Sequence, residues 1–135
     1  MQLEPLLHAS WLIVIHVGTL LAAWLIGTWL LFVSRKGDTS HRAIGKLFLT
    51  LITLTAAVAF FIPDPRSHFH GLGPLHYTVP LALLFVGLAW AGARTHRLRL
   101  HRFGVFGLYF GSLMFTAVVN IFLGNGIAHQ IFFGQ

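Results

Sequence analysis

The sequence contains no cysteine, and it has only three carboxylates, Glu4, Asp38 and Asp64. The absence of cysteine excludes disulfides, thiolate metal sites and the covalent attachment of c-type haem. Three separate carboxylates do not form an acid–base pair, and the sequence has neither a nucleophile–base motif nor a phosphate-binding loop. We therefore predict no catalytic residue.

Charge of either sign is scarce. Only 9% of the residues are charged, whereas 56% are hydrophobic, a balance that is not typical of soluble globular domains. Four stretches are apolar and almost free of charge, at residues 11–33, 43–62, 77–93 and 103–123. Each is about long enough to cross a hydrocarbon layer of ~30 Å as a helix. The sequence predicts an all-α integral membrane protein with four transmembrane helices in a single domain, residues 1–135.

The positive charges cluster near two of the three predicted connections. Eight of the nine Lys and Arg residues lie there: Arg35, Lys36, Arg42 and Lys46 near the first, and Arg94, Arg97, Arg99 and Arg102 near the third. By the positive-inside rule, both basic turns are cytoplasmic and both termini are periplasmic in a bacterial inner membrane. The net charge of +6 is then explained by the lipid bilayer, with anionic headgroups facing the turns, and no nucleic-acid partner is expected.

The second half of the chain repeats the first at a constant offset of 60 residues. The matched pairs include Pro5 with Pro65, His8 with His68, His16 with His76, His41 with His101 and Arg42 with Arg102. Three histidine pairs coincide where composition predicts about 0.3. We expect two parallel helix hairpins in an up-down-up-down bundle, with repeat one at about 5–62, repeat two at about 65–123 and an outer-surface tail at 124–135.

The start of the second helix is marked by the run Asp38-Thr39-Ser40. Short carboxylate and hydroxyl side chains accept hydrogen bonds from the first free N–H groups of a helix. This run predicts an N-cap for a helix that begins near His41.

The repeat predicts that equivalent histidines face each other. In an up-down-up-down bundle the first and third helices are diagonal, as are the second and fourth. His16 then lies across from His76 at the outer end, and His41 across from His101 at the cytoplasmic end. The diagonal of roughly 11–14 Å is about the gap that two imidazoles span when both bind one iron. These four residues are the predicted haem b ligands.

Other interpretations of the histidines remain open. An ionisable side chain inside an apolar helix needs a partner, and for His16 this is a metal, a haem iron, or a hydrogen bond to Thr19, Asn120 or a carbonyl. His41 and His101 alternatively cap helices or contact lipid phosphate, and His96 is expected at the surface. A non-haem Cu, Zn or Fe site on the outer face is the alternative cofactor site, with ligands drawn from His8, His16, His68, His70, His76 and His129.

The residues also resemble a known family. The run His16-Val17-Gly18, then Gly27, Lys36-Gly37, His41-Arg42 and Gly45, resembles the first half of the small bacterial membrane proteins filed as domain of unknown function twenty-three-oh-six. Gly73-Pro74-Leu75-His76, His101, Leu108-Tyr109 and Gly111 are similar to its second half, although Leu123-Gly124-Asn125 stands where that family has Pro-Gly-Arg. The resemblance implies a four-helix membrane fold and no assigned reaction. A topological likeness to four-helix b-type cytochromes is an analogy of fold.

Three functions are consistent with these patterns. The paired histidines favour haem-based electron transfer with a redox partner or quinone. The outer histidines alone favour the metal site. Small residues four apart, such as Gly18 with Ala22 and Gly87 with Ala91, would also suit a homo-oligomer or a non-catalytic structural subunit of a larger membrane complex.

Overall fold

The computed structural model describes residues 11–62, 74–118 and 122, and every regular element among them is helical. The predicted outer-surface tail at 124–135 lies outside the described residues. The first hairpin consists of α2 (Trp11–Phe32) and α3 (Thr39–Phe60). The carboxylate of Asp38 accepts a hydrogen bond of 2.7 Å from the backbone N–H of His41, so the predicted N-cap of α3 is confirmed.

The C-terminus of α2 is capped by a lysine. Helices end with carbonyl groups that lack intrahelical partners, and a cation near them is favourable. Lys36 Nζ donates to three such oxygens, those of Leu30 and Leu31 at 2.8 Å and that of Ser34 at 3.1 Å. The first turn is thus held by its own charged side chains.

The second hairpin begins with a short 3₁₀ turn, η1 (Pro74–Tyr77), which leads directly into α4 (Thr78–Arg94). After residues 95–97 the chain forms α5 (Leu98–Phe106), the π-helical segment η2 (Gly107–Met114) and α6 (Phe115–Val118) without interruption. The predicted fourth helix is therefore one helical segment whose middle is widened to π geometry.

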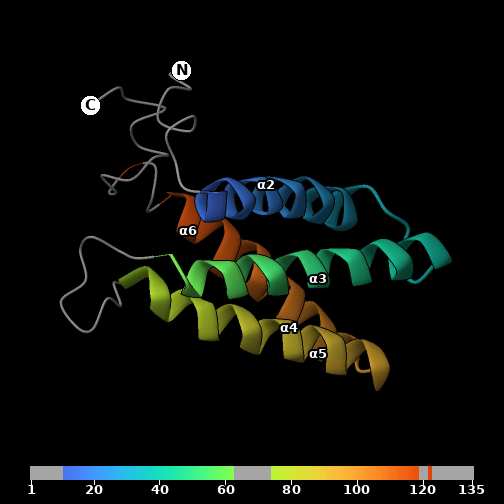
Figure 1. Ribbon diagram of the computed structural model, residues 1–135. Helices are drawn as coiled ribbons and strands as arrows, with labels where there is room; N and C mark the ends of the chain where they lie inside the picture. The colour runs from blue at the N-terminus through green and yellow to red at the C-terminus, as the bar shows by residue number, and fades with distance from the viewer. Residues whose placement is uncertain (1–10, 63–73, 119–121, 123–135) are drawn as a thin grey trace.

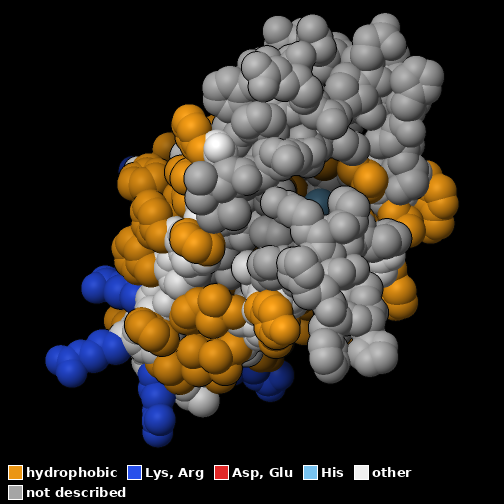
Figure 2. All heavy atoms as spheres, turned by 90° about the vertical axis from the view of Figure 1, so that its left-hand side faces the viewer, with side chains coloured by type: hydrophobic (Ala, Val, Ile, Leu, Met, Phe, Trp, Pro, Cys, Tyr) orange, Lys and Arg blue, Asp and Glu red, His pale blue; other side chains and the backbone are white. Residues whose placement is uncertain are grey.

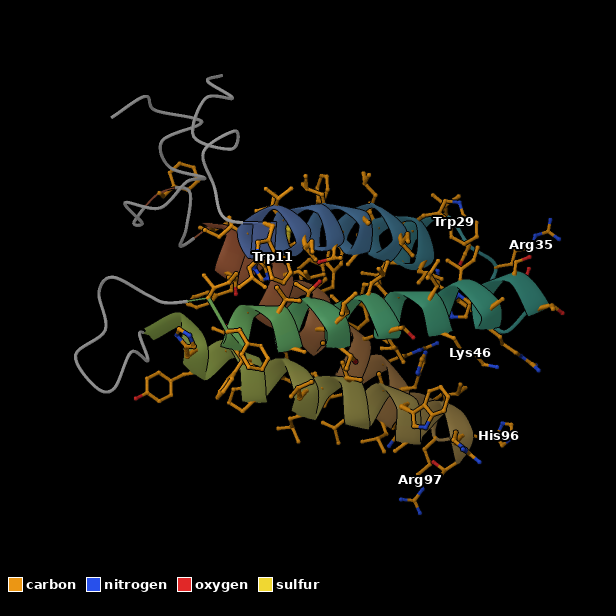
Figure 3. All side chains as sticks on the ribbon, viewed as in Figure 1. Trp11, Trp29, Arg35, Lys46, His96 and Arg97 are labelled. Carbon is orange, nitrogen blue, oxygen red and sulfur yellow. The ribbon has the colours of Figure 1, made fainter. Side chains whose placement is uncertain are left out.

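Successive helical segments alternate in direction, so the two hairpins run in the same sense (Figure 1). α2 packs against α3 and η2, while α4 packs against α3, α5 and η2. The turns at 33–38 and 95–97 lie at one end of the bundle, where Arg35, His96 and Arg97 are found (Figure 3). The arrangement agrees with the alternation predicted from the sequence repeat.

The two hairpins differ in how closely their helices approach. The turn at 95–97 is shorter than that at 33–38, and glycines line the contact between α4 and α5. A Cβ on Gly104 would overlap the backbone N of Ala89, and a Cβ on Gly92 would overlap the backbone N of His101. The equivalents of these glycines in the first repeat are Ile44 and Phe32, so the first hairpin has side chains at the positions where the second brings backbones together.

The core lies between the helices and is small. Its buried members are Ala23, Leu30, Phe48, Ile52, Ala82, Leu108, Tyr109 and Leu113. Large hydrophobic side chains instead cover the flanks of the bundle, with Lys and Arg extending beyond them (Figure 2). Both α2 and α3 are long and apolar enough to cross a membrane, with a mean hydropathy of 1.9, yet only 11% and 22% of their most apolar windows are buried.

The glycine contacts predict a matched pair of mutational effects. Gly104→Ala should lower the free energy of unfolding by about 1–3 kcal/mol, because the new Cβ meets backbone that cannot move aside. Gly45→Ala places the same Cβ where no atom lies within 4 Å, so its cost should be close to zero. Thermal unfolding of both variants in detergent measures the difference. Equal destabilisation would contradict the packing described for α4 and α5.

Candidate cofactor site

His41 lies in the first turn of α3 and is half-buried. Its Nδ1 is 2.7 Å from Oγ of Ser34, a buried residue that follows α2. The Ser34 hydroxyl also lies 3.1 Å from the carbonyl of Leu30, and its single proton can be donated to only one of these two acceptors. When that proton is donated to Leu30, the neutral ring of His41 carries its own proton on Nδ1 and leaves Nε2 unprotonated.

His101 lies in the first turn of α5 and is fixed in a similar way. Its Nδ1 is 2.9 Å from the carbonyl oxygen of Ala89 on α4, and a carbonyl can only accept. The absence of a side chain at Gly92 lets the backbone of His101 lie directly against α4. His101 thus also donates from Nδ1 and keeps Nε2 as a ligand or acceptor.

His41 and His101 lie at the same end of the bundle, in the first turns of α3 and α5, and both are half-buried. Charged side chains lie near His41, because Lys36 Nζ donates to the carbonyl of Ser34 and the carboxylate of Asp38 accepts from the backbone N–H of His41. One turn beyond His41 on the same helix face, an added Cβ on the half-buried Gly45 would meet no atom within 4 Å. The alternation of the helices therefore brings the predicted inner pair to one end of the bundle.

At the other end, His16 joins α2 to α3. Its Nδ1 donates to the carbonyl of Thr55 at 3.1 Å, and Thr55 Oγ1 donates to Thr19 Oγ1 at 2.8 Å. A carbonyl was one of the partners that the sequence predicted for His16. Donation from Nδ1 also leaves Nε2 of this half-buried ring unprotonated.

His76 lies in η1 and also binds α3. Its Nε2 donates to the carbonyl of Ile62 at 3.1 Å, and its ring packs edge-on against Phe60, with 6.3 Å between centroids. The acceptor of His16, Thr55, lies within α3, whereas the acceptor of His76, Ile62, follows the end of α3 at Phe60. The two outer histidines therefore contact α3 at different levels and through different ring nitrogens.

Of the five remaining histidines, His96 is the one that the structure describes. His96 is exposed, as predicted, and adopts a left-handed backbone conformation with φ of 55° in the turn at 95–97 (Figure 3). His8, His68, His70 and His129 of the predicted outer metal site lie outside the described residues. Within residues 11–62, 74–118 and 122, no three or more His, Asp or Glu residues are grouped as a metal site would require.

Sequence reasoning missed the groups that orient these rings. Ser34, Thr55 and the carbonyl of Ala89 were not predicted, and neither was the hydrogen bond of 2.6 Å between Thr28 and Tyr109, which joins α2 to η2. Hydroxyl residues within apolar helices were the available signal, because they need partners in lipid. Their partners depend on how the helices meet.

No protein-family model, curated protein or solved structure matches the chain. The resemblance to the family of unknown function stays a prediction.

The hydrogen bonds predict a specific set of tautomers. At a pH where imidazole is neutral, ¹⁵N spectra should show Nδ1 protonated in His16, His41 and His101 and Nε2 protonated in His76. In a Ser34→Ala variant, His41 should lose its preference for the Nδ1 proton, while His101 is unchanged. If His41 kept the same tautomer without Ser34, the role assigned to that hydroxyl would be wrong.

Proposed function

We propose that this chain is a four-span integral membrane protein that holds haem b between His41 and His101. The observation that carries the proposal is the matched orientation of the two rings. Nδ1 of each ring lies within hydrogen-bond distance of a protein oxygen, Oγ of Ser34 for His41 and the carbonyl of Ala89 for His101, so Nε2 is the nitrogen available to a ligand. This arrangement is characteristic of histidines that ligate metals, because the hydrogen bond fixes the ring and raises the basicity of the other nitrogen.

Two features near the histidines support the proposal. Gly45, one turn from His41, leaves space beside α3, since an added Cβ would meet no atom within 4 Å. The guanidinium group of Arg102, next in sequence to His101, is suited to the negative propionates of haem. When bound, haem would supply one-electron chemistry, and a redox partner or quinone would exchange the electron. The protein's own contribution would be to orient the ligands and to set the polarity around them.

The membrane assignment is supported by where the apolar side chains lie. Core helices of soluble proteins are apolar because they are buried, whereas α2 and α3 are apolar and largely exposed. Large hydrophobic side chains such as Leu25 (62% exposed), Phe32 (69%) and Phe103 (61%) face outward, as lipid contact requires. Residues 74–94 and 98–118 form helical segments about long enough to supply two further spans. The family resemblance implies the same fold.

Haem binding is tested by absorbance. After expression with adequate haem supply, the detergent-purified protein should show a Soret band, and reduction with dithionite should sharpen the visible bands of a six-coordinate b-type haem. His41→Ala and His101→Ala should each abolish or strongly reduce the Soret band, because each removes one axial ligand. The absence of a Soret band in the wild-type protein would end the proposal.

Two further variants separate ligand loss from misfolding. His96→Ala removes an exposed histidine at the same end of the bundle and should leave the spectrum unchanged. His101→Met retains a side chain able to bind iron and should keep haem with a shifted spectrum and a raised reduction potential. If His41→Ala and His101→Ala both retained haem fully, other residues would provide the ligands.

A metal site is the second candidate function. The observation that favours it is that His16, inside the apolar part of α2, donates Nδ1–H to a carbonyl and so keeps Nε2 for a ligand. Elemental analysis of the same purified protein distinguishes it from haem. Stoichiometric Cu, Zn or Fe without porphyrin, lost when His16 and His76 are both changed to Ala, would support the outer site.

The four-span topology predicts a pattern of chemical labelling. The absence of cysteine allows single cysteines to be introduced without background. In intact cells, a membrane-impermeant maleimide applied from the periplasm should label Tyr77→Cys and leave Arg35→Cys and Thr95→Cys unlabelled until the membrane is permeabilised. Labelling of Arg35→Cys and Thr95→Cys from opposite sides would contradict the parallel hairpins.

A further inference from the structure

The structure distinguishes two basic turns that are similar in sequence. In the first turn, Lys36 donates to three carbonyl oxygens, and Arg42 Nε donates to the carbonyl of Gly37 at 3.1 Å. The carboxylate of Asp38 also lies in this turn. Two of the four cations near the first turn, Lys36 and Arg42, therefore donate hydrogen bonds within the protein. The negative charge of Asp38 would also repel an anion that binds there.

The second turn has neither feature. Arg97 and Arg99 are exposed, and their side chains make no hydrogen bond or ion pair with the described part of the chain. The position equivalent to Asp38 in the repeat is Leu98, so no carboxylate stands here. Arg94 lies over the ring of Trp90, 5.9 Å from its centroid. We define the arginine turn as Arg94, Arg97 and Arg99.

The side chains next to the arginine turn are apolar. Leu98 is 67% exposed and Trp90 is 42% exposed, both on the same hairpin as the arginines. Residues 96–100 line an open hollow of about 440 Å³. A surface that alternates guanidinium groups with exposed Leu and Trp matches the boundary between phosphate headgroups and acyl chains. A nucleic acid or an acidic protein would offer no apolar layer for those side chains.

We propose that the arginine turn is a binding site for anionic phospholipid headgroups, in which guanidinium groups hold the phosphate and Leu98 and Trp90 enter the acyl region. Arginine suits this role because its planar fork can donate two hydrogen bonds to one phosphate. The first basic turn contributes less to lipid binding, because some of its cations cap its own helices. This inference rests on the proposed membrane placement and is independent of haem.

The test measures binding of the first lipid molecule to the purified full chain by native mass spectrometry. Phosphatidylglycerol should bind the wild type more tightly than phosphatidylcholine. Arg97→Gln/Arg99→Gln should weaken phosphatidylglycerol binding by about 25-fold, from about fivefold for each arginine. The charge-matched control Arg35→Gln/Lys46→Gln removes two exposed cations near the first turn, where the carboxylate of Asp38 opposes an anion, and should weaken binding by much less.

Several outcomes would overturn the proposal. These are equal losses in both double variants, no preference for phosphatidylglycerol in the wild type, or displacement of the lipid by a short DNA duplex. Equal thermal unfolding temperatures of all variants without added lipid would exclude misfolding as the cause of weaker lipid binding. A haem-free His101→Ala protein should bind phosphatidylglycerol like the wild type. Failure of the haem proposal can therefore be distinguished from failure of the lipid proposal. Failure of the membrane placement appears separately, as periplasmic labelling of Thr95→Cys.

Discussion

The bundle depends on the close approach of helix backbones at positions that lack side chains. In the proposed membrane setting, burial of apolar surface gives no preference for helix contact, so van der Waals packing and hydrogen bonds would have to hold the helices together. Gly92 and Gly104 provide such packing between α4 and α5, and Gly27 provides it against Phe48 and Tyr109 on α3 and η2. The same contact at Gly92 places the backbone of His101 against α4, where its ring reaches the carbonyl of Ala89. The packing at Gly92 therefore also positions His101 of the candidate site.

Hydrogen bonds between helices supply the second component of this stability. Thr55 binds Thr19 while His16 binds the carbonyl of Thr55, and Thr28 binds Tyr109. In an apolar medium each such bond satisfies polar groups that have few alternatives, although its measured worth is modest, about 0.6 kcal/mol on average. The bond to the carbonyl of Thr55 also selects the tautomer of a neutral His16. A ring that must donate to a carbonyl has only one neutral tautomer available, and its other nitrogen is left as an acceptor or ligand. Structural and functional interpretations of His16 are therefore compatible.

The duplicated hairpins have diverged in ways that matter for function. The first has a longer turn, a carboxylate N-cap and a lysine C-cap, all supplied by its own side chains. The second has a short turn, glycine-mediated packing and two arginines, Arg97 and Arg99, whose side chains make no hydrogen bond or ion pair with the described residues. Nδ1 of His41 contacts a hydroxyl of its own turn, whereas Nδ1 of His101 contacts a backbone carbonyl of the facing helix. Equivalent positions in the repeat are thus held by different contacts.

The sequence by itself determined the helical segments, their alternation, the N-cap at Asp38, the clustering of positive charge at one end and the placement of His41 and His101 at that same end. These follow from composition, local capping chemistry and the repeat, which depend on residues near one another in the chain or on a fixed offset. Only the tertiary structure decided which oxygen each histidine contacts and how the two basic turns differ. It also decided which glycines are closely packed: an added Cβ at Gly18 or Gly87 would meet no described atom within 4 Å, whereas Gly92 and Gly104 lie directly against backbone. Those features depend on the rotation and axial position of one helix against another, which side chains from distant parts of the chain set jointly.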